Sequence, residues 1–238
     1  MIPLRDDNPT RRVPLVTVSL IFVNVVVFLY QVSLGPRQGQ AFVYEYGAIP
    51  AVIFGYRALP DFLAAVPPTV SLFTSMFLHG GWLHLIGNMW YLWIFGDNIE
   101  EAMGKFRYIA FYLLCGILAS LSHALANPSS TIPSIGASGA ISGVLGAYLL
   151  VYPRAHVLVL IPLWFFVRMM YIPAGLVLGF WFLLQLLSGS MSGGEGGGIA
   201  FWAHIGGFVA GMLLVGLFKK REVRFFNPPR YHSGYVEW

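Results

Sequence analysis

Five polar residues lie within or beside long apolar stretches of the sequence: His84, Asn88, His123, Ser138 and His204. A polar group costs a few kcal/mol when such a stretch enters a membrane, so each of them is a candidate for function. Serine becomes a good nucleophile when a neutral imidazole takes its proton. A second imidazole and an amide can donate hydrogen bonds to the oxyanion that forms. These are the parts of an acyl-transfer site.

The composition indicates the elements that must hold these residues. Of the 238 residues, 57% are hydrophobic and 10% are charged, with a mean hydropathy of +0.71. Soluble domains carry about 25% charged residues. We therefore expect an all-α polytopic membrane protein in the lipid bilayer. The net charge is +4, and most of the basic residues lie in short clusters beside apolar segments. Such clusters set the orientation of a protein in the membrane, so this role is favoured over nucleic-acid binding.

Six apolar segments are long enough to be membrane spans, since about 17 to 25 residues cross a hydrocarbon core. They predict a six-helix membrane domain over residues 14–218, between an N-terminal segment, 1–13, and a C-terminal tail, 219–238. We expect residues 156–170 to be interfacial or to dip back into the protein. The spans are about 14–34, 81–97, 107–126, 139–153, 171–188 and 200–218.

Basic residues are distributed unequally between the predicted connections. With the N-terminus inside, the outer connections contain only Arg37 and Arg57, and this asymmetry predicts that both termini are cytoplasmic. The compact arrangement with short tails fits a bacterial plasma membrane best. The predicted inner basic residues are Arg5, Arg11, Arg12, Lys105, Arg107, Arg154, Arg168, Lys219, Lys220, Arg221, Arg224 and Arg230.

Counting along the predicted helices places Ser138, His204 and His84 at a similar depth. Each lies roughly 20 to 24 Å from the inner end of its helix, at about 1.5 Å per residue. Asn88 follows His84 by one helical turn and shares its face. His123 lies near the outer end of its helix, where headgroups or loop backbone are its more natural partners.

Small residues on two of these helices would allow close approach. A stripe of small residues alone more often serves packing than chemistry. Here, however, a histidine at matching depth lies on the glycine face of the other helix, which favours catalysis. The stripes are Gly139, Gly143 and Gly146 on one helix, and His204, Gly207 and Gly211 on the other.

The sequence offers no carboxylate at this depth to orient His204, so a Ser138–His204 dyad is favoured over a triad. Cys115, the single cysteine, lies within an apolar run and is best explained as a buried spectator. No cofactor or metal is called for.

The motifs HGGWLHLIGN (79–88), GASG (136–139) and AHIGG (203–207), in this order across six spans, resemble those of the rhomboid intramembrane serine proteases. The resemblance implies a six-helix rhomboid-like bundle whose short fourth helix starts at the catalytic serine. It also implies single-span transmembrane proteins as substrates. The roles it implies are Ser138 as nucleophile, His204 as base, His84 and Asn88 as oxyanion donors, and His79, Gly136, Gly139 and Gly207 as supporting residues.

Two positions depart from the family pattern. Many members have an aromatic residue four positions after the nucleophile, against which the catalytic imidazole rests, and here that residue is Ser142. Many also carry a Trp-Arg pair in the first outer loop, which the stretch PTVSLFTSMF lacks. The first departure leaves open how His204 is held.

Other classes of protein explain the polar residues less well. The HExxH pattern of a metalloprotease and a pair of intramembrane aspartates are both absent from the sequence. A six-helix transporter would be expected to show an internal repeat or broken helices. An inactive rhomboid-like protein that binds membrane clients would typically lack the serine or the histidine. A serine endopeptidase is the favoured hypothesis, with the last two as alternatives.

Overall fold

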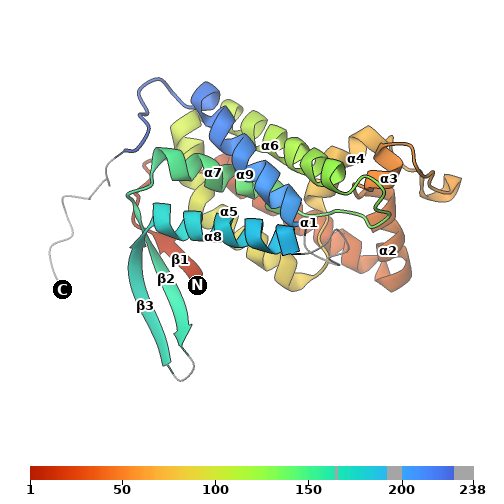
Figure 1. Cartoon of the computed structure of the whole chain (residues 1–238), viewed down its shortest axis with the longest axis horizontal. Coiled ribbons are helices and arrows are strands. Elements are labelled where there is room, and N and C mark those ends of the chain that lie inside the picture. The colour runs from red at the N-terminus through yellow and green to blue at the C-terminus, as the bar shows by residue number, and fades with distance from the viewer. Residues whose placement is uncertain (164–165, 192–199, 228–238) are drawn as a thin grey trace.

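The computed structural model describes residues 1–163, 166–191 and 200–227. Its main helices lie side by side along the long axis of the molecule (Figure 1). They correspond to the six predicted spans, and the fourth begins at Ser138, as predicted. These helices are α1 (Leu15–Ser33), α5 (Trp82–Met103), α6 (Lys105–Ala126), α7 (Ser138–Val151), α8 (Ala174–Met191) and α9 (Phe201–Phe218).

Four of these helices, α1, α6, α8 and α9, are long and apolar enough to cross a membrane. Helix α5 meets the same limits together with residues 61–77, from which it is bent by 80°. Helix α7 is apolar but has only 14 residues, which corresponds to about 21 Å. The polytopic helical fold is thus confirmed, while the crossing of the membrane by all six segments stays a prediction.

The connection between α1 and α5 forms short helical pieces at one end of the bundle (Figure 1). Proline at or next to the first helical position starts α2, α3 and α4, where its missing N–H costs nothing. This end also carries the loop that leads into α7, because Ala48 and Ser134 pair through their backbones. The pieces are α2 (Gly35–Tyr46), α3 (Pro50–Ile53), η1 (Asp61–Leu63), α4 (Pro68–Thr74) and η2 (Ser75–Phe77).

A three-stranded antiparallel sheet at the other end was not expected from the sequence. Strand β2 (His156–Leu163) pairs with β3 (Phe166–Pro173) and with β1 (Ile2–Asp6), in the order β1-β2-β3. The all-α class therefore describes the membrane helices, whereas residues 156–163 and 166–173 form strands and do not dip back into the bundle. The interfacial position of this region stays a prediction. The continuous apolar run there is compatible with either structure, and its strand partner lies about 150 residues earlier in the chain.

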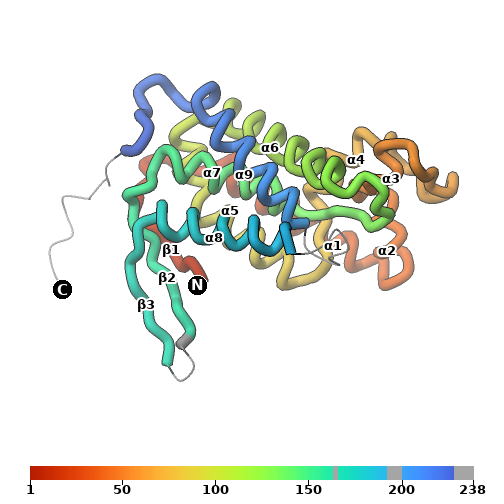
Figure 2. The backbone as a smooth tube through the Cα atoms, in the orientation of Figure 1, coloured from red at the N-terminus to blue at the C-terminus, as the bar shows by residue number. Residues whose placement is uncertain are grey.

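Helix α7 is the central element of the bundle. Every residue from Gly139 to Tyr148 is buried, and the helix packs against α5, α6 and α9. Because protein rather than lipid surrounds it, α7 is free to be shorter than the bilayer core. The backbone tube shows α8 at the edge of the bundle beside α9 (Figure 2).

A buried carboxylate attaches α1 to α5. Glu100 accepts hydrogen bonds from the backbone N–H groups of Val16 and Thr17, at 3.0 and 2.8 Å, and from the Thr17 hydroxyl at 2.9 Å. These are donors at the N-terminus of α1 that have no acceptor within the helix, so Glu100 caps that helix. Glu100 thereby fixes α1 against α5, and α5 packs against the central α7.

Candidate active site

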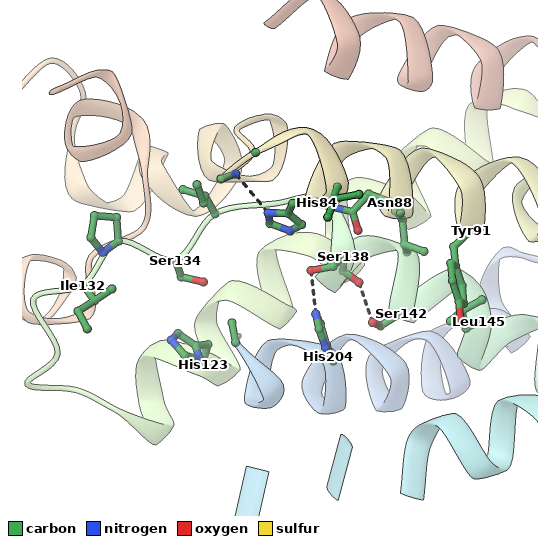
Figure 3. A pocket seen from close by; sticks show the side chains of 18 of the residues that line it. His84, Asn88, Tyr91, His123, Ile132, Ser134, Ser138, Ser142, Leu145 and His204 are labelled. Carbon is green, nitrogen blue, oxygen red and sulfur yellow. Dashed lines mark hydrogen bonds between the residues drawn. The ribbon is translucent and has the colours of Figure 1, made fainter. Parts of the chain in front are cut away.

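Ser138 and His204 are in hydrogen-bond contact. The distance from His204 Nε2 to Ser138 Oγ is 2.8 Å (Figure 3). Ser138 is the first residue of α7, and His204 lies in the first turn of α9. Two residues 66 positions apart thus meet because two helix N-termini lie side by side. The structure brings together the predicted nucleophile and base.

The glycine stripes explain how the two helices come so close. A Cβ atom added at Gly207 would overlap the backbone carbonyl of Gly139, and one at Gly211 would overlap the backbone of Gly143. The two backbones are therefore in direct contact at both levels. Both glycine pairs come from the predicted stripes, and the contact sets the distance between Ser138 and His204.

His84 and Asn88 lie on α5 beside the residues that precede Ser138. The backbone N–H of Gly80 donates to His84 Nδ1 at 3.2 Å, so a neutral His84 ring carries its hydrogen on Nε2. Asn88 is buried, and its Nδ2 amide group has no hydrogen-bond partner among the described residues. Among the residues that the structure describes, neither of these two N–H donors has a recorded acceptor, so both can serve a ligand.

Gly136 brings the chain close to these two donors. It has a φ of +123°, and a Cβ atom there would lie 2.8 Å from His84 Nε2 and 3.6 Å from Asn88 Nδ2. Glycine is thus required both by conformation and by space. The donors of α5 face the chain just before Ser138, as the view of the site shows (Figure 3).

The N-terminus of α7 adds backbone donors. Its N-cap residue is Ala137, which has no side chain able to cap the helix. The N–H groups of the first turn have no acceptor within the helix, and the helix dipole favours negative charge there. Ser138 lies at this end, so a developing negative charge beside its hydroxyl would meet both side-chain and backbone donors.

His79 is completely buried behind His84. The two ring centroids are 5.1 Å apart at 66°, and the His79 ring also makes an edge contact with Phe28 at 6.4 Å. The backbone of His79 is held by the Gln31 side chain, whose amide nitrogen donates to the His79 carbonyl at 2.8 Å. The structure thus places His79 against His84, and its supporting role stays a prediction.

Two residues of α8 that were not expected from the sequence contact His204. Gln185 Oε1 lies 2.7 Å from His204 Nδ1, and the Trp181 ring lies 5.9 Å from the imidazole at an interplanar angle of 36°. One signal in the sequence was available. Gln185 is a strongly polar side chain within the apolar run WFLLQLL, and it should have been counted with the other intramembrane polar residues.

A cavity of about 1010 Å³ opens beside Ser138 and His204. His84, Asn88 and Trp181 line it, together with residues of the loop before α7. His123, also in the lining, lies away from the Ser138–His204 pair (Figure 3). Among the described residues, no group of three or more His, Cys, Asp or Glu side chains is arranged to hold a metal ion. The cavity is large enough for a short extended peptide.

Comparisons with known proteins agree with these features. The rhomboid domain family matches residues 68–221, more than half of the chain. The chain is 34% identical to Rhomboid-like protease 5 of Toxoplasma gondii over 157 residues, which cover 64% of this chain and 16% of that protein. It is 32% identical to RHOMBOID-like protein 1 of Arabidopsis thaliana over 166 residues, 69% of this chain and 39% of the relative.

A bacterial relative is similar over a shorter stretch. Rhomboid protease GluP of Bacillus subtilis is 42% identical over 80 residues, which cover 34% of this chain and 15% of that protein. The chain therefore spans well under two thirds of the length of these relatives. The matched family and the apolar helices agree with each other: the chain is an integral membrane protein that belongs to the rhomboid family, a family that includes intramembrane serine proteases.

Proposed function

We propose that this protein is an intramembrane serine endopeptidase that cleaves single-span transmembrane substrates with a Ser138–His204 dyad. The observation that carries the proposal is the 2.8 Å contact between Ser138 Oγ and His204 Nε2, beside the buried Asn88 Nδ2, which has no hydrogen-bond partner in the described part of the chain. A nucleophile in contact with a base, next to free donors, is the arrangement that acyl transfer requires.

The first half of the reaction forms an acyl-enzyme. Ser138 Oγ attacks the carbonyl carbon of the scissile peptide bond, and His204 Nε2 takes the hydroxyl proton. The carbonyl oxygen becomes an oxyanion, which accepts hydrogen bonds from His84 Nε2, Asn88 Nδ2 and the first-turn N–H groups of α7. When the C–N bond breaks, His204 returns the proton to the leaving amine.

The second half releases the other product. Water attacks the Ser138 ester carbonyl, His204 accepts a proton from that water, and the same donors stabilise the second oxyanion. Collapse of this intermediate breaks the ester bond, and the proton returns to Ser138 Oγ. The free enzyme is regenerated without a cofactor, since every proton passes through His204.

The resemblance to rhomboid proteases supports single transmembrane helices as the substrate class, and the physics of helices agrees with it. A transmembrane helix has its carbonyls bonded internally, so the segment that is cut must first unwind. Glycine and other poor helix formers near the cut lower the cost of unwinding. We therefore expect cleavage near the outer part of the span, at small or helix-breaking residues.

Two alternatives are less well supported. An inactive rhomboid-like client-binding protein has no need for a serine and a histidine at hydrogen-bond distance. A six-helix transporter would use polar residues to bind a solute, but the donors here gather around one serine hydroxyl. Cleavage of a generic transmembrane substrate in lipid vesicles, compared with Ser138→Ala, distinguishes the protease from both.

We further propose that the protein lies in a bacterial plasma membrane and that both of its termini are on the cytoplasmic side. Among the described basic residues that predict this orientation, Arg5 lies in β1, Lys105 begins α6 and Lys219 follows α9, whereas Arg57 lies at the opposite end with α3. Single cysteines at Arg57 and Arg221, in a Cys115→Ala background, should react with an impermeant maleimide from opposite sides. In intact bacterial cells only the Arg57 position should be labelled, and labelling of both positions would refute the orientation.

Removing one oxyanion donor should lower the rate of cleavage less than removing Ser138 or His204. We expect His84→Ala or Asn88→Ala to lower kcat by roughly 100 to 1,000-fold, because each removes one donor and leaves the others. The folded structure should survive, since Asn88 Nδ2 bonds to no other described residue. Initial rates of substrate cleavage measure the effect. If the Asn88→Ala variant kept the full wild-type kcat, Asn88 would not be an oxyanion donor.

A further inference from the structure

We propose that Gln185 is a positioning residue that selects the tautomer and orientation of His204 in the dyad. This inference rests on the proposed function. It starts from the two contacts of the imidazole, which has Ser138 Oγ at 2.8 Å from Nε2 and Gln185 Oε1 at 2.7 Å from Nδ1. Both ring nitrogens are thus engaged, one by α7 and the other by α8.

The chemistry of the two partners decides where the proton lies. An amide oxygen only accepts hydrogen bonds, and a neutral imidazole has one N–H. Facing Gln185 Oε1, His204 therefore carries its hydrogen on Nδ1 and leaves the Nε2 lone pair directed at the Ser138 hydroxyl. Without this acceptor, the ring is free to place its hydrogen on Nε2, and that tautomer cannot take the serine proton.

The same contact also serves the charged form of the base. When His204 takes the proton from Ser138, both ring nitrogens carry hydrogen, and the Nδ1–H bond to Gln185 becomes a bond from a cation. An amide oxygen stabilises that cation through its dipole and adds no net charge to a site within the membrane, where an ionised carboxylate is expensive. Gln185 therefore takes the orienting role for which the sequence has no carboxylate.

Trp181 completes the setting of the ring. It precedes Gln185 by one helical turn, so both side chains leave the same face of α8, and its ring lies 5.9 Å from the imidazole. Ser142 donates its hydroxyl to the Ser138 carbonyl at 2.6 Å and so bonds to its own helix. The aromatic contact of the base therefore comes from α8 rather than from α7.

Packing between α8 and α9 holds this face in place. Phe182 stacks on Phe208 with ring centroids 4.4 Å apart and an interplanar angle of 17°. Phe208 lies one turn after His204 on α9, so the stack fixes the rotation of α8 next to the base. The orientation of His204 therefore depends on the docking of a helix at the edge of the bundle.

The test compares two substitutions that differ in hydrogen bonding. Gln185→Met keeps a similar volume but removes the hydrogen-bond acceptor. We expect kcat to fall about 10 to 100-fold, because a hydrogen bond to the charged imidazolium is lost. KM should change less than about threefold, because the substrate does not contact Gln185. Gln185→Glu keeps an acceptor and should retain more than about a third of the wild-type kcat. Leu184→Ala, at an exposed neighbour on the same helix, is the matched control and should behave as wild type.

A spectroscopic readout separates positioning from a merely structural role. In ¹⁵N-histidine-labelled protein, with the His204 signals assigned from their loss in His204→Asn, the wild type should show the Nδ1–H tautomer. Gln185→Met should shift the population toward Nε2–H, and Gln185→Glu should not. An unchanged tautomer in Gln185→Met, or equal kcat in the Met variant and the wild type, would overturn the proposal. An inactive wild type with the Gln185-dependent tautomer intact would instead count against the proposed function alone.

Discussion

Replacing Ser138 or His204 with alanine is expected to lower cleavage of a transmembrane substrate by about 10⁴ to 10⁶-fold, which removes all measurable turnover. The physical reason is the 2.8 Å contact between their side chains, because each residue is useless for acyl transfer without the other. The double variant should be no less active than either single variant, since residues that act as a unit are not additive. Turnover in lipid vesicles measures the effect.

Active-site labelling gives a second measurement of the same prediction. A fluorophosphonate should attach to Ser138 in the wild type and react poorly with His204→Ala, in which no base takes the serine proton. Ser19→Ala and His156→Ala change the same residue types far from the cavity and should keep most of the activity. Full cleavage by Ser138→Ala, or label on another residue, would mean that GASG serves helix packing alone.

Gly211→Ala is expected to abolish the proposed protease activity although residue 211 lies outside the cavity lining. A Cβ atom there would overlap the Gly143 backbone, which has no rotamer by which to move away. Overpacking of this kind costs about 1 to 3 kcal/mol of stability. It must also push α7 and α9 apart, and a displacement of about 1 Å between reacting groups costs on the order of 100-fold in rate. Thermal unfolding in detergent and substrate cleavage measure the two effects.

Gly179→Ala is the matched control for this change. It makes the same substitution within a membrane helix, but a Cβ atom at Gly179 would meet nothing within 4 Å. Alanine favours the helix over glycine by up to about 1 kcal/mol, so this variant should be as stable as the wild type or slightly more stable. If Gly211→Ala were as stable and active as Gly179→Ala, close contact between the two helices would not be required.

Much of the bundle and site was predictable because the signals are local. Each span is a run of apolar residues, and each intramembrane polar residue has a cost that marks it. The glycines at positions 139, 143, 207 and 211 indicate a close contact between two helices. The similar depth of Ser138 and His204 along their helices then predicted that these two residues are neighbours. The spans, the start of α7 and the pairing of these two residues therefore needed no tertiary information.

Trp181 and Gln185, the residues of α8 that contact His204, were not predicted, because the surroundings of a membrane helix are apolar. In a soluble helix the apolar side marks the face turned to the core, but lipid tails are as apolar as leucine. Helix α8 is apolar nearly all round, with exposed and half-buried residues on most of its surface. Its own sequence thus does not indicate that Trp181 and Gln185 face α9. His204 was consequently expected to act without an orienting partner.

The sequence by itself determined the membrane class, the helices and the polar residues that meet in the bundle, because these depend on hydrophobicity and on short spacings. The tertiary structure decided two further features. Strands β2 (156–163) and β3 (166–173) form a sheet with residues 2–6, a pairing between distant segments that no local pattern specifies. The rotation of α8, set by Phe182 stacking on Phe208, places Gln185 against His204. Both features depend on contacts between segments far apart in the chain, and only the folded chain brings those segments together.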